Sequence, residues 1–175
     1  MSKKRCYVIA WAFFICYLLF ANRIILYFDK DAKAERVDLS DYYGDATVHY
    51  YIDTYEKRGG LLEKYYIQGW AYCETEQDNQ GKTISILLKN TKNDSCYKIE
   101  NKAQYRIDVY EAFKKEKKIY NAMNGLESCF STIGISEGEY QLYLYVEENK
   151  TDYGVTATNL FYVKDKNEFV FVGVK

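Results

Sequence analysis

Arg106 and Asp108 are the two residues of this sequence whose types and spacing come closest to a chemical site. They lie two positions apart in the segment QYRIDV (104–109), which alternates apolar and polar residues as a strand does. On a strand they would share one face. A catalytic interpretation makes Asp108 an acid or base whose pKa Arg106 tunes. We favour a structural ion pair at a sheet edge or beneath a following helix, because no second carboxylate or nucleophile is fixed nearby.

Gly69 and Trp70 form the second candidate site, in the middle of the strand predicted over 62–74. A glycine inside a strand commonly marks a β-bulge or the close approach of another chain. A tryptophan in a central strand usually anchors a core, although an exposed indole can also stack on sugar rings. We therefore interpret both residues as structural, with sugar binding at Trp70 as the alternative.

Other chemical motifs are absent from the sequence. It has no GxSxG elbow to present a serine, no Walker motif and no dinucleotide-binding fingerprint. His49 is the only histidine, and Cys73, Cys96 and Cys129 lack metal-ligand spacing, so neither a metal nor a cofactor is predicted. Two interpretations of these three cysteines stay open: one disulfide with a spare thiol, or three buried free thiols.

The elements that would position these residues are short segments with a period of two. The twenty tyrosines favour strands. One short helix or helical turn is predicted from Val109 onward, where apolar residues recur at helical spacing as far as Tyr120. The predicted strands cover 47–55, 62–74, 82–89, 95–100, 104–109, 127–135, 139–147, 155–163 and 168–174. Many short strands at regular spacing with a single helix predict an all-β sandwich.

An apolar segment, residues 6–28, precedes this predicted domain, and Arg23 is its only charged residue. As a helix the segment would rise ~34 Å, enough to cross a hydrocarbon core of ~30 Å. We predict a single-pass transmembrane helix that serves as an uncleaved signal anchor. A signal peptide cleaved at Ala21 is the alternative, which the bulky Leu19 and Phe20 before that position disfavour.

Charge predicts the orientation of this segment and the organisation of the chain. Four of the 24 Lys and Arg residues lie at or before Arg23, so the rest of the chain holds 20 of them against all 25 acidic residues. The positive-inside rule then places the N-terminus inside and the C-terminal domain outside. No basic patch stands out in the sequence, so nucleic acid is not expected as a partner. The predicted parts are a cytoplasmic basic N-terminus (1–5), the membrane helix (6–28), a linker or stalk (29–46) and an extracytoplasmic β-sandwich domain (47–175).

A series of short motifs runs through the predicted domain. In chain order they are Gly69-Trp70-Ala71, Ile86-Leu87-Leu88, Tyr97, Arg106-x-Asp108-Val109 with Phe113, Gly125-Leu126 and Gly138-x-Tyr140. Together they resemble small Ig-like β-sandwich accessory modules encoded with bacterial surface-polysaccharide genes, some fused to glycosyltransferases. Those modules usually have Phe after the glycine where Leu126 stands here. The resemblance implies an Ig-like antiparallel sandwich with an accessory or binding role, and it carries over no catalytic residue.

These observations lead us to expect a membrane-anchored, non-catalytic binding or accessory protein of the bacterial cell envelope. It would contact membrane lipid through residues 6–28 and bind an envelope glycan or a membrane protein. The alternatives are an enzyme that modifies cell-wall polysaccharide and a structural subunit of a membrane complex. Exposed aromatic side chains in a groove would favour binding, two carboxylates converging in a cleft would favour an enzyme, and a flat apolar patch would favour a subunit.

Overall fold

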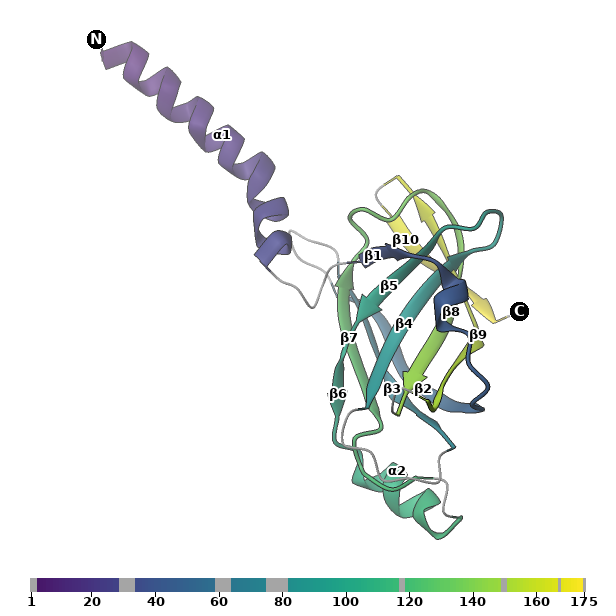
Figure 1. The fold of residues 1–175 in the computed structure, drawn as a ribbon. Helices are drawn as coiled ribbons and strands as arrows, with labels where there is room; N and C mark the ends of the chain where they lie inside the picture. Colours follow the sequence, from purple (N-terminus) through teal and green to yellow (C-terminus); the bar gives the residue numbers. More distant parts are fainter. Residues whose placement is uncertain are drawn as a thin grey trace.

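The computed structural model describes residues 3–28, 34–58, 64–74, 82–116, 119–148, 151–166 and 168–174. Within these ranges ten strands form two antiparallel sheets, so the predicted all-β sandwich is confirmed (Figure 1). The six-stranded sheet has the order β1-β5-β4-β8-β9-β10, and the four-stranded sheet has the order β2-β3-β7-β6.

The bounds of the elements follow the predicted segments in most places. The six-stranded sheet contains β1 (Ala34–Val37), β5 (Cys96–Glu100), β4 (Thr83–Asn90), β8 (Gly138–Glu147), β9 (Tyr153–Asp165) and β10 (Glu168–Val174). The four-stranded sheet contains β2 (Val48–Arg58), β3 (Lys64–Cys73), β7 (Gly125–Ser131) and β6 (Lys102–Gln104). The helices are α1 (Lys3–Phe28), α2 (Ile107–Phe113) and two 3-10 turns, Leu39–Tyr42 and Lys114–Glu116.

The hydrophobic core lies between the two sheets and follows from the alternation of side chains along each strand. Tyr65, Ile67 and Ala71 of β3 point into it, as their spacing predicts. Phe130 of β7 and Leu142 of β8 are completely buried there. Each such large apolar side chain stabilises the fold by ~1.5–3 kcal/mol relative to an exposed one.

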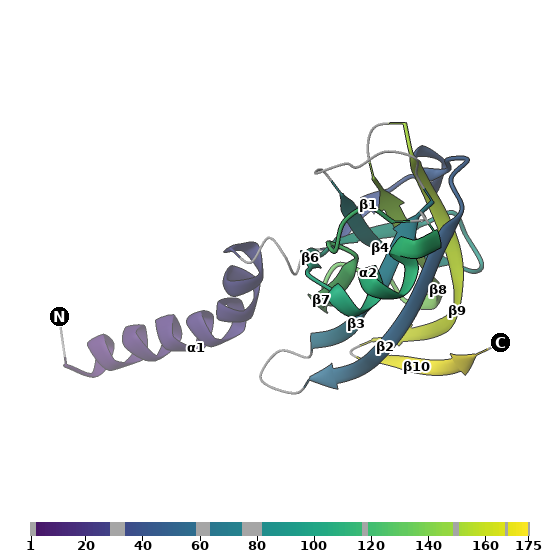
Figure 2. The same cartoon turned by 90° about the horizontal axis from the view of Figure 1, so that it is seen from below.

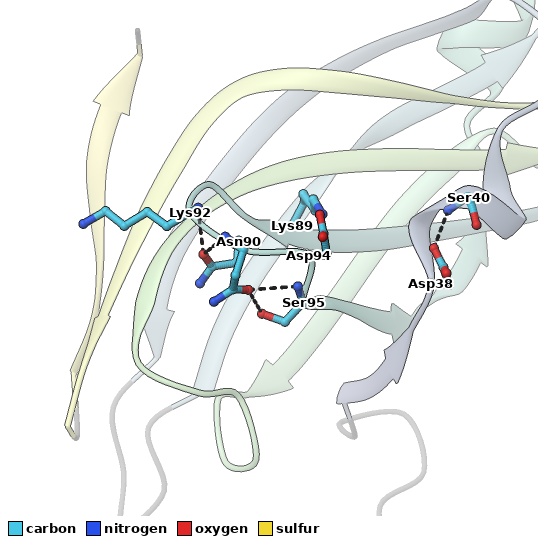
Figure 3. Close-up of polar contacts among 8 residues, drawn as sticks. Asp38, Ser40, Lys89, Asn90, Lys92, Asp94 and Ser95 are labelled. Carbon is cyan, nitrogen blue, oxygen red and sulfur yellow. Dashed lines mark hydrogen bonds and ion pairs between the residues drawn. The ribbon is translucent and has the colours of Figure 1, made fainter.

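The hairpin of β4 and β5 shows how local sequence sets the strand register (Figure 3). The side-chain carbonyl of Asn90 accepts hydrogen bonds from the backbone N–H groups of Lys92 and Asn93, at 2.9 and 3.1 Å. The Asn93 side chain then accepts one from the N–H of Ser95 at 2.9 Å. Asparagine side chains replace backbone acceptors in this way in tight turns, and the predicted hairpin is confirmed.

The strand predicted over 104–109 is wrong beyond Gln104. The backbone N–H of Arg106 donates to the carbonyl of Ala122 at 2.7 Å, and the Arg106 carbonyl accepts from the N–H of Tyr110 at 3.1 Å. The chain therefore turns into α2 at Ile107, and the predicted short helix is confirmed with an earlier start. These residues form a helix and not a strand because Val109 and its neighbours pack on the outer face of the four-stranded sheet.

The linker predicted over 29–46 is wrong for residues 34–37. These residues form β1, which pairs with β5 from Ala34 opposite Ile99 to Val37 opposite Cys96. Leu39, just beyond β1, is buried against the outer face of the six-stranded sheet. Burial of these apolar residues accounts for the difference, and the sandwich begins before residue 47. Residues 29–33 lie outside the described ranges.

The helix α1 contains 26 residues and projects away from the sandwich in both views (Figures 1 and 2). Trp11 and Phe13 are among its large apolar side chains, and they are exposed. Among the residues that the structure describes, no helix combines the length and the apolar character of a membrane span. The side chains of Cys6, Arg23 and residues 24–28 lie outside the described part.

Candidate functional site

The four residues singled out in the sequence lie close together on the outer face of the four-stranded sheet. Arg106 donates from Nε and Nη2 to the carboxylate of Asp108 at 2.9 and 2.7 Å, so the predicted ion pair is present. A third residue, Asp53 of β2, accepts a bond from Arg106 Nη1 at 2.6 Å. Asp53 was not predicted, because it lies 53 positions away along the chain. Arg106 therefore joins the N-terminal end of α2 to the edge strand β2.

This cluster is electrostatically suited to structure rather than to proton transfer. The hydrogen bonds from Arg106 lower the pKa of Asp108 to about 2. The two carboxylates in turn raise the pKa of Arg106. A general acid or base works best with a pKa near the operating pH. Asp108 stays ionised at neutral pH, and its role is to hold the guanidinium.

Gly69 allows β2 and β3 to approach each other next to this cluster. A Cβ at Gly69 would lie 2.3 Å from the carbonyl oxygen of Tyr51, which is too close for any other residue. β2 has a bulge opposite, between Ile52 and Thr54. Of the two alternatives predicted for Gly69, the structure shows the close approach of another strand, and the bulge lies in that strand at Asp53.

Trp70 points away from the main core, and its ring lies half-buried between two tyrosines. Its centroid is 6.4 Å from that of Tyr51 and 5.8 Å from that of Tyr72, with near-parallel ring planes. Phe113 of α2 packs against the indole at 5.5 Å. Trp70 therefore anchors α2 on the sheet instead of filling the space between the sheets.

A groove that the sequence did not predict lies at the edge of the sandwich, between β2 and β3 on one side and β9 and β10 on the other. Its volume is about 280 Å³. Its aromatic lining consists of Tyr55, Tyr65, Tyr66, Tyr162, Phe169 and Phe171. Glu56, Lys57 and Glu168 supply charged groups to the lining. We call this feature the aromatic groove.

The rings of the aromatic groove contact one another across the two sheets. Tyr162 of β9 stacks on Phe169 of β10 with centroids 4.7 Å apart and planes 10° from parallel. Tyr65 of β3 meets the same ring edge-on at 5.0 Å. Tyr55 of β2 lies 4.2 Å from Phe171. These contacts fix the walls of the groove, since both sheets hold the rings in place.

The hydroxyl of Tyr162 stands out among the polar atoms of the groove. Tyr162 is 3% exposed, and its hydroxyl has no hydrogen-bond partner among the described residues. Burial raises the pKa of this phenol, so it stays protonated and can donate. A buried hydroxyl without a partner costs roughly 1–3 kcal/mol. The hydroxyl atom itself is buried, so a ligand in the groove reaches it only if the surrounding rings move.

The charged residues near the groove are partly paired. Glu56 accepts a bond from Nε of Arg58 at 2.6 Å, and the Arg58 guanidinium lies 3.4 Å from the centre of the Tyr66 ring. In the described ranges no three His, Cys, Asp or Glu residues are arranged to hold a metal ion. The groove is thus an aromatic site with polar groups at its rim.

The cysteines take no part in either site. Cys73, Cys96 and Cys129 are free thiols in the structure, and the interpretation as buried free thiols holds for Cys73 and Cys96, whereas Cys129 is partly exposed. Burial raises the pKa of Cys73 to about 12 and that of Cys96 to about 11. Thiols with such values are unreactive at neutral pH, so both behave as small apolar side chains.

Comparisons with protein-family models, with curated proteins and with solved structures gave no match for this chain. The geometry of the aromatic groove and of the Arg106 cluster is therefore the basis for assigning a function.

Proposed function

We propose that this protein is a membrane-anchored, non-catalytic binding module of the bacterial cell envelope and that its aromatic groove binds a glycan. The observation that carries the proposal is the groove itself, which is lined by six aromatic rings and by charged groups. Ligand sites typically combine an apolar, aromatic lining with a few placed polar groups. The volume of about 280 Å³ suits one or two sugar rings of a longer chain.

The polar groups favour a glycan over a purely apolar ligand. An apolar ligand would leave the Tyr162 hydroxyl unpaired, so the free-energy cost of burying that hydroxyl without a partner would remain. A sugar presents an apolar ring face that stacks on aromatic side chains. It also presents hydroxyls that can pair with Tyr162 and with the carboxylate of Glu168 at the rim.

An enzyme that modifies cell-wall polysaccharide is the second candidate, and one observation favours it. Glu56 and Glu168 both line the groove, and glycosidases use two facing carboxylates. Against this, Glu56 is already ion-paired with Arg58, and an ionised carboxylate accepts hydrogen bonds without donating a proton. We therefore assign both residues to binding.

The strand orders support an Ig-like topology for the sandwich. With β2 as strand A, the order β2-β3-β7-β6 corresponds to A-B-E-D of the immunoglobulin fold. The order β5-β4-β8-β9 corresponds to C′-C-F-G. β1 and β10 are then additions at the two edges of the larger sheet, and β10 supplies part of the groove.

The membrane anchor is proposed for residues 6–28, with the N-terminus inside and the domain outside. The proposal rests on the sequence of residues 6–28, in which Arg23 is the only charged residue, because no helix of the described residues meets the description of a membrane span. Support also comes from the exposed apolar side chains of Trp11 and Phe13, which lipid would cover. The basic residues 3–5 precede this segment, in agreement with the positive-inside rule. A membrane complex that uses α1 as a subunit contact remains the structural alternative.

The test measures binding of size-fractionated envelope polysaccharide to the full chain in detergent micelles by calorimetry. Tyr55→Ala removes an exposed ring that lines the groove, and Tyr43→Ala removes another exposed ring that does not line it. We expect Tyr55→Ala to weaken binding at least tenfold and Tyr43→Ala to leave it unchanged. Equal affinities of the two variants would refute binding at the groove.

Catalysis is separated from binding by the Glu168→Gln variant. If the protein is a binding module, Glu168→Gln should weaken its affinity for the polysaccharide. Neither the wild type nor the variant should then release sugar from the polysaccharide. Release of reducing ends by the wild type, abolished in Glu168→Gln at unchanged affinity, would support the enzyme instead.

A further inference from the structure

Lys82, Asn124 and Glu148 form a buried polar cluster at the end of the sandwich where β3 ends and β4 begins, opposite the end of β3 that borders the groove. Lys82 directly precedes β4, Asn124 precedes β7 and Glu148 follows β8. The side chains of Lys82 and Glu148 are only 2% and 4% exposed, and Asn124 is 1% exposed. The cluster thus brings together three functional groups from both sheets and excludes water from them.

The Nζ of Lys82 contacts both of the other side chains. It lies 2.5 Å from Oε1 of Glu148 and 2.5 Å from Oδ1 of Asn124. Burial lowers the pKa of Lys82. Desolvation disfavours both charges of an ion pair, so a proton can pass from the ammonium to the carboxylate and leave a neutral amine. A neutral amine is a nucleophile, and the side-chain amide of Asn124 is its neighbour.

We propose that Lys82 and Asn124 are joined by an intramolecular isopeptide bond that forms with Glu148 as the proton carrier. The lone pair of Lys82 Nζ attacks Cγ of Asn124, and the protonated Glu148 donates a hydrogen bond to the developing oxyanion. The carbonyl re-forms as the Cγ–Nδ2 bond breaks. Glu148 carries the proton from Nζ to Nδ2, which leaves as ammonia.

The reaction balances without any co-reactant. The ammonium of Lys82, the carboxylate of Glu148 and the amide of Asn124 become one secondary amide, one free ammonia and one neutral carboxylic acid. No atom changes oxidation state. The three groups needed are those that the cluster holds, so folding alone would trigger the bond.

The surroundings of Asn124 orient its amide for this step. Nδ2, the leaving nitrogen, donates a hydrogen bond to the carbonyl of Asn121 at 2.6 Å, which turns it away from Lys82. The backbone carbonyl of Asn124 accepts from the N–H of Ala71 at 2.9 Å, which fixes the residue against β3. Reacting groups held at contact distance in fixed orientations gain large effective concentrations.

The bond would join the two sheets of the sandwich. Lys82 belongs to the six-stranded sheet through β4, and Asn124 belongs to the four-stranded sheet through β7. A cross-link between distant positions stabilises a fold by restricting the unfolded chain, as a disulfide does. The three cysteines after residue 28 are free thiols, so this link would take the place of a disulfide.

The test is the mass of the denatured full chain. We expect the wild type to weigh one ammonia less than its sequence, and Lys82→Arg and Asn124→Ala to have their full sequence masses. Lys89→Arg is the matched control, because the Nζ of Lys89 pairs with an exposed carboxylate, Asp94. A wild-type chain at its full mass would overturn the proposal and leave a buried ion pair with a hydrogen bond.

Peptide mapping distinguishes the isopeptide bond from a succinimide at Asn124-Gly125, which also loses one ammonia. The isopeptide bond yields one branched tryptic peptide that contains both Lys82 and Asn124, with no cleavage after Lys82. A succinimide leaves Lys82 cleavable and the two peptides separate, which would overturn the proposal. Glu148→Gln should retain the full mass, and a cross-linked Glu148→Gln chain would remove Glu148 from the mechanism.

Discussion

The phenol of Tyr65 accepts a hydrogen bond from the backbone N–H of Phe169 at 3.1 Å, which joins β3 of one sheet to β10 of the other. Both residues are buried, so the N–H of Phe169 has exchanged water for this one partner. Tyr162, on the neighbouring strand β9, carries a hydroxyl that is equally buried and has no partner among the described residues. The aromatic groove therefore contains one phenol that holds the structure together and one whose buried hydroxyl is left without a partner.

The first prediction compares Tyr65→Phe with Tyr162→Phe. Each change removes a single oxygen atom at the aromatic groove. Tyr65→Phe leaves a buried N–H unsatisfied and should reduce the free energy of unfolding by ~1–3 kcal/mol. Tyr162→Phe removes an unpaired polar atom and should leave that free energy unchanged or raised, while binding weakens. Urea denaturation of both variants measures the difference, and equal losses would contradict the assignment of the two hydroxyls.

The second prediction concerns Trp70→Ala. A tryptophan deleted from a fully packed core costs ~3–5 kcal/mol. Trp70 is half-buried beneath α2, so we expect about half that cost. Hydrogen exchange should become faster in α2, while the amides of β8, which lie in the main core, keep their relative protection. Protection lost uniformly over both sheets would show that Trp70 supports the main core instead.

Much of the fold was predictable because it depends on local patterns. Alternation located most strands, and the segment 82–100 with its Asn-rich turn was recognisable as a hairpin. The segments whose predictions were wrong are those in which tertiary contacts determine the secondary structure. Residues 34–37 carry charges that look solvated, yet they form the edge strand β1, which pairs with β5. The strand predicted over 104–109 became α2 because the sheet beneath it offered the partly buried Trp70 and the buried Tyr72 for packing.

The aromatic groove was beyond sequence reasoning for a physical reason. Its rings come from two pairs of strands, β2 with β3 and β9 with β10, which lie far apart in the sequence, and each ring alone is indistinguishable from a core residue. The one available signal was the recurrence of Phe169 and Phe171 on the same face of the last predicted strand. The Arg106–Asp108 pair was predictable because its members are two positions apart, whereas Asp53 depends on the bulge in β2.

The third prediction concerns the start of the folded domain. A chain that begins at Ala34 retains β1 and Leu39, whereas one that begins at Thr47 lacks both. The shorter chain exposes β5 as an edge strand and uncovers Leu87, which Leu39 packs against. We expect it to be less stable by ~2 kcal/mol or more, since a buried leucine alone contributes ~1.5–3 kcal/mol, and to aggregate through β5. Melting temperature and light scattering measure both effects, and identical behaviour would assign 34–46 to a linker after all.

The fourth prediction tests the proposed topology. If residues 6–28 form a signal anchor with the N-terminus inside, protease added outside intact protoplasts degrades the domain. Because a folded sandwich resists cleavage, a tobacco etch virus protease site inserted between Asp29 and Lys30 makes the assay specific. Cleavage in intact cells is the expected result. Protection in intact cells, with cleavage after lysis, would reverse the orientation, and a shortened mature chain lacking residues 1–21 would establish a cleaved signal peptide.

The last prediction is the pH dependence of Asp108→Asn. Arg106 lowers the pKa of Asp108 in the folded protein to about 2, below the ordinary value of 3.8. A depressed pKa means that the ionised form stabilises the fold, so the contribution is complete above about pH 4 and disappears as the pH falls towards 2. The side chain of Asp108 is 61% exposed, so solvent screening limits this contribution to below ~1 kcal/mol. The difference in unfolding free energy between wild type and Asp108→Asn should therefore be small at pH 7 and vanish near pH 2.

Asp53→Asn serves as the comparison, because Asp53 is more buried and binds the same guanidinium at 2.6 Å. It should cost more than Asp108→Asn at neutral pH. A destabilisation by Asp108→Asn that grows as the pH falls would contradict the ion pair as the source, and loss of glycan binding at pH 7 with an unchanged melting temperature would place Asp108 in a functional site.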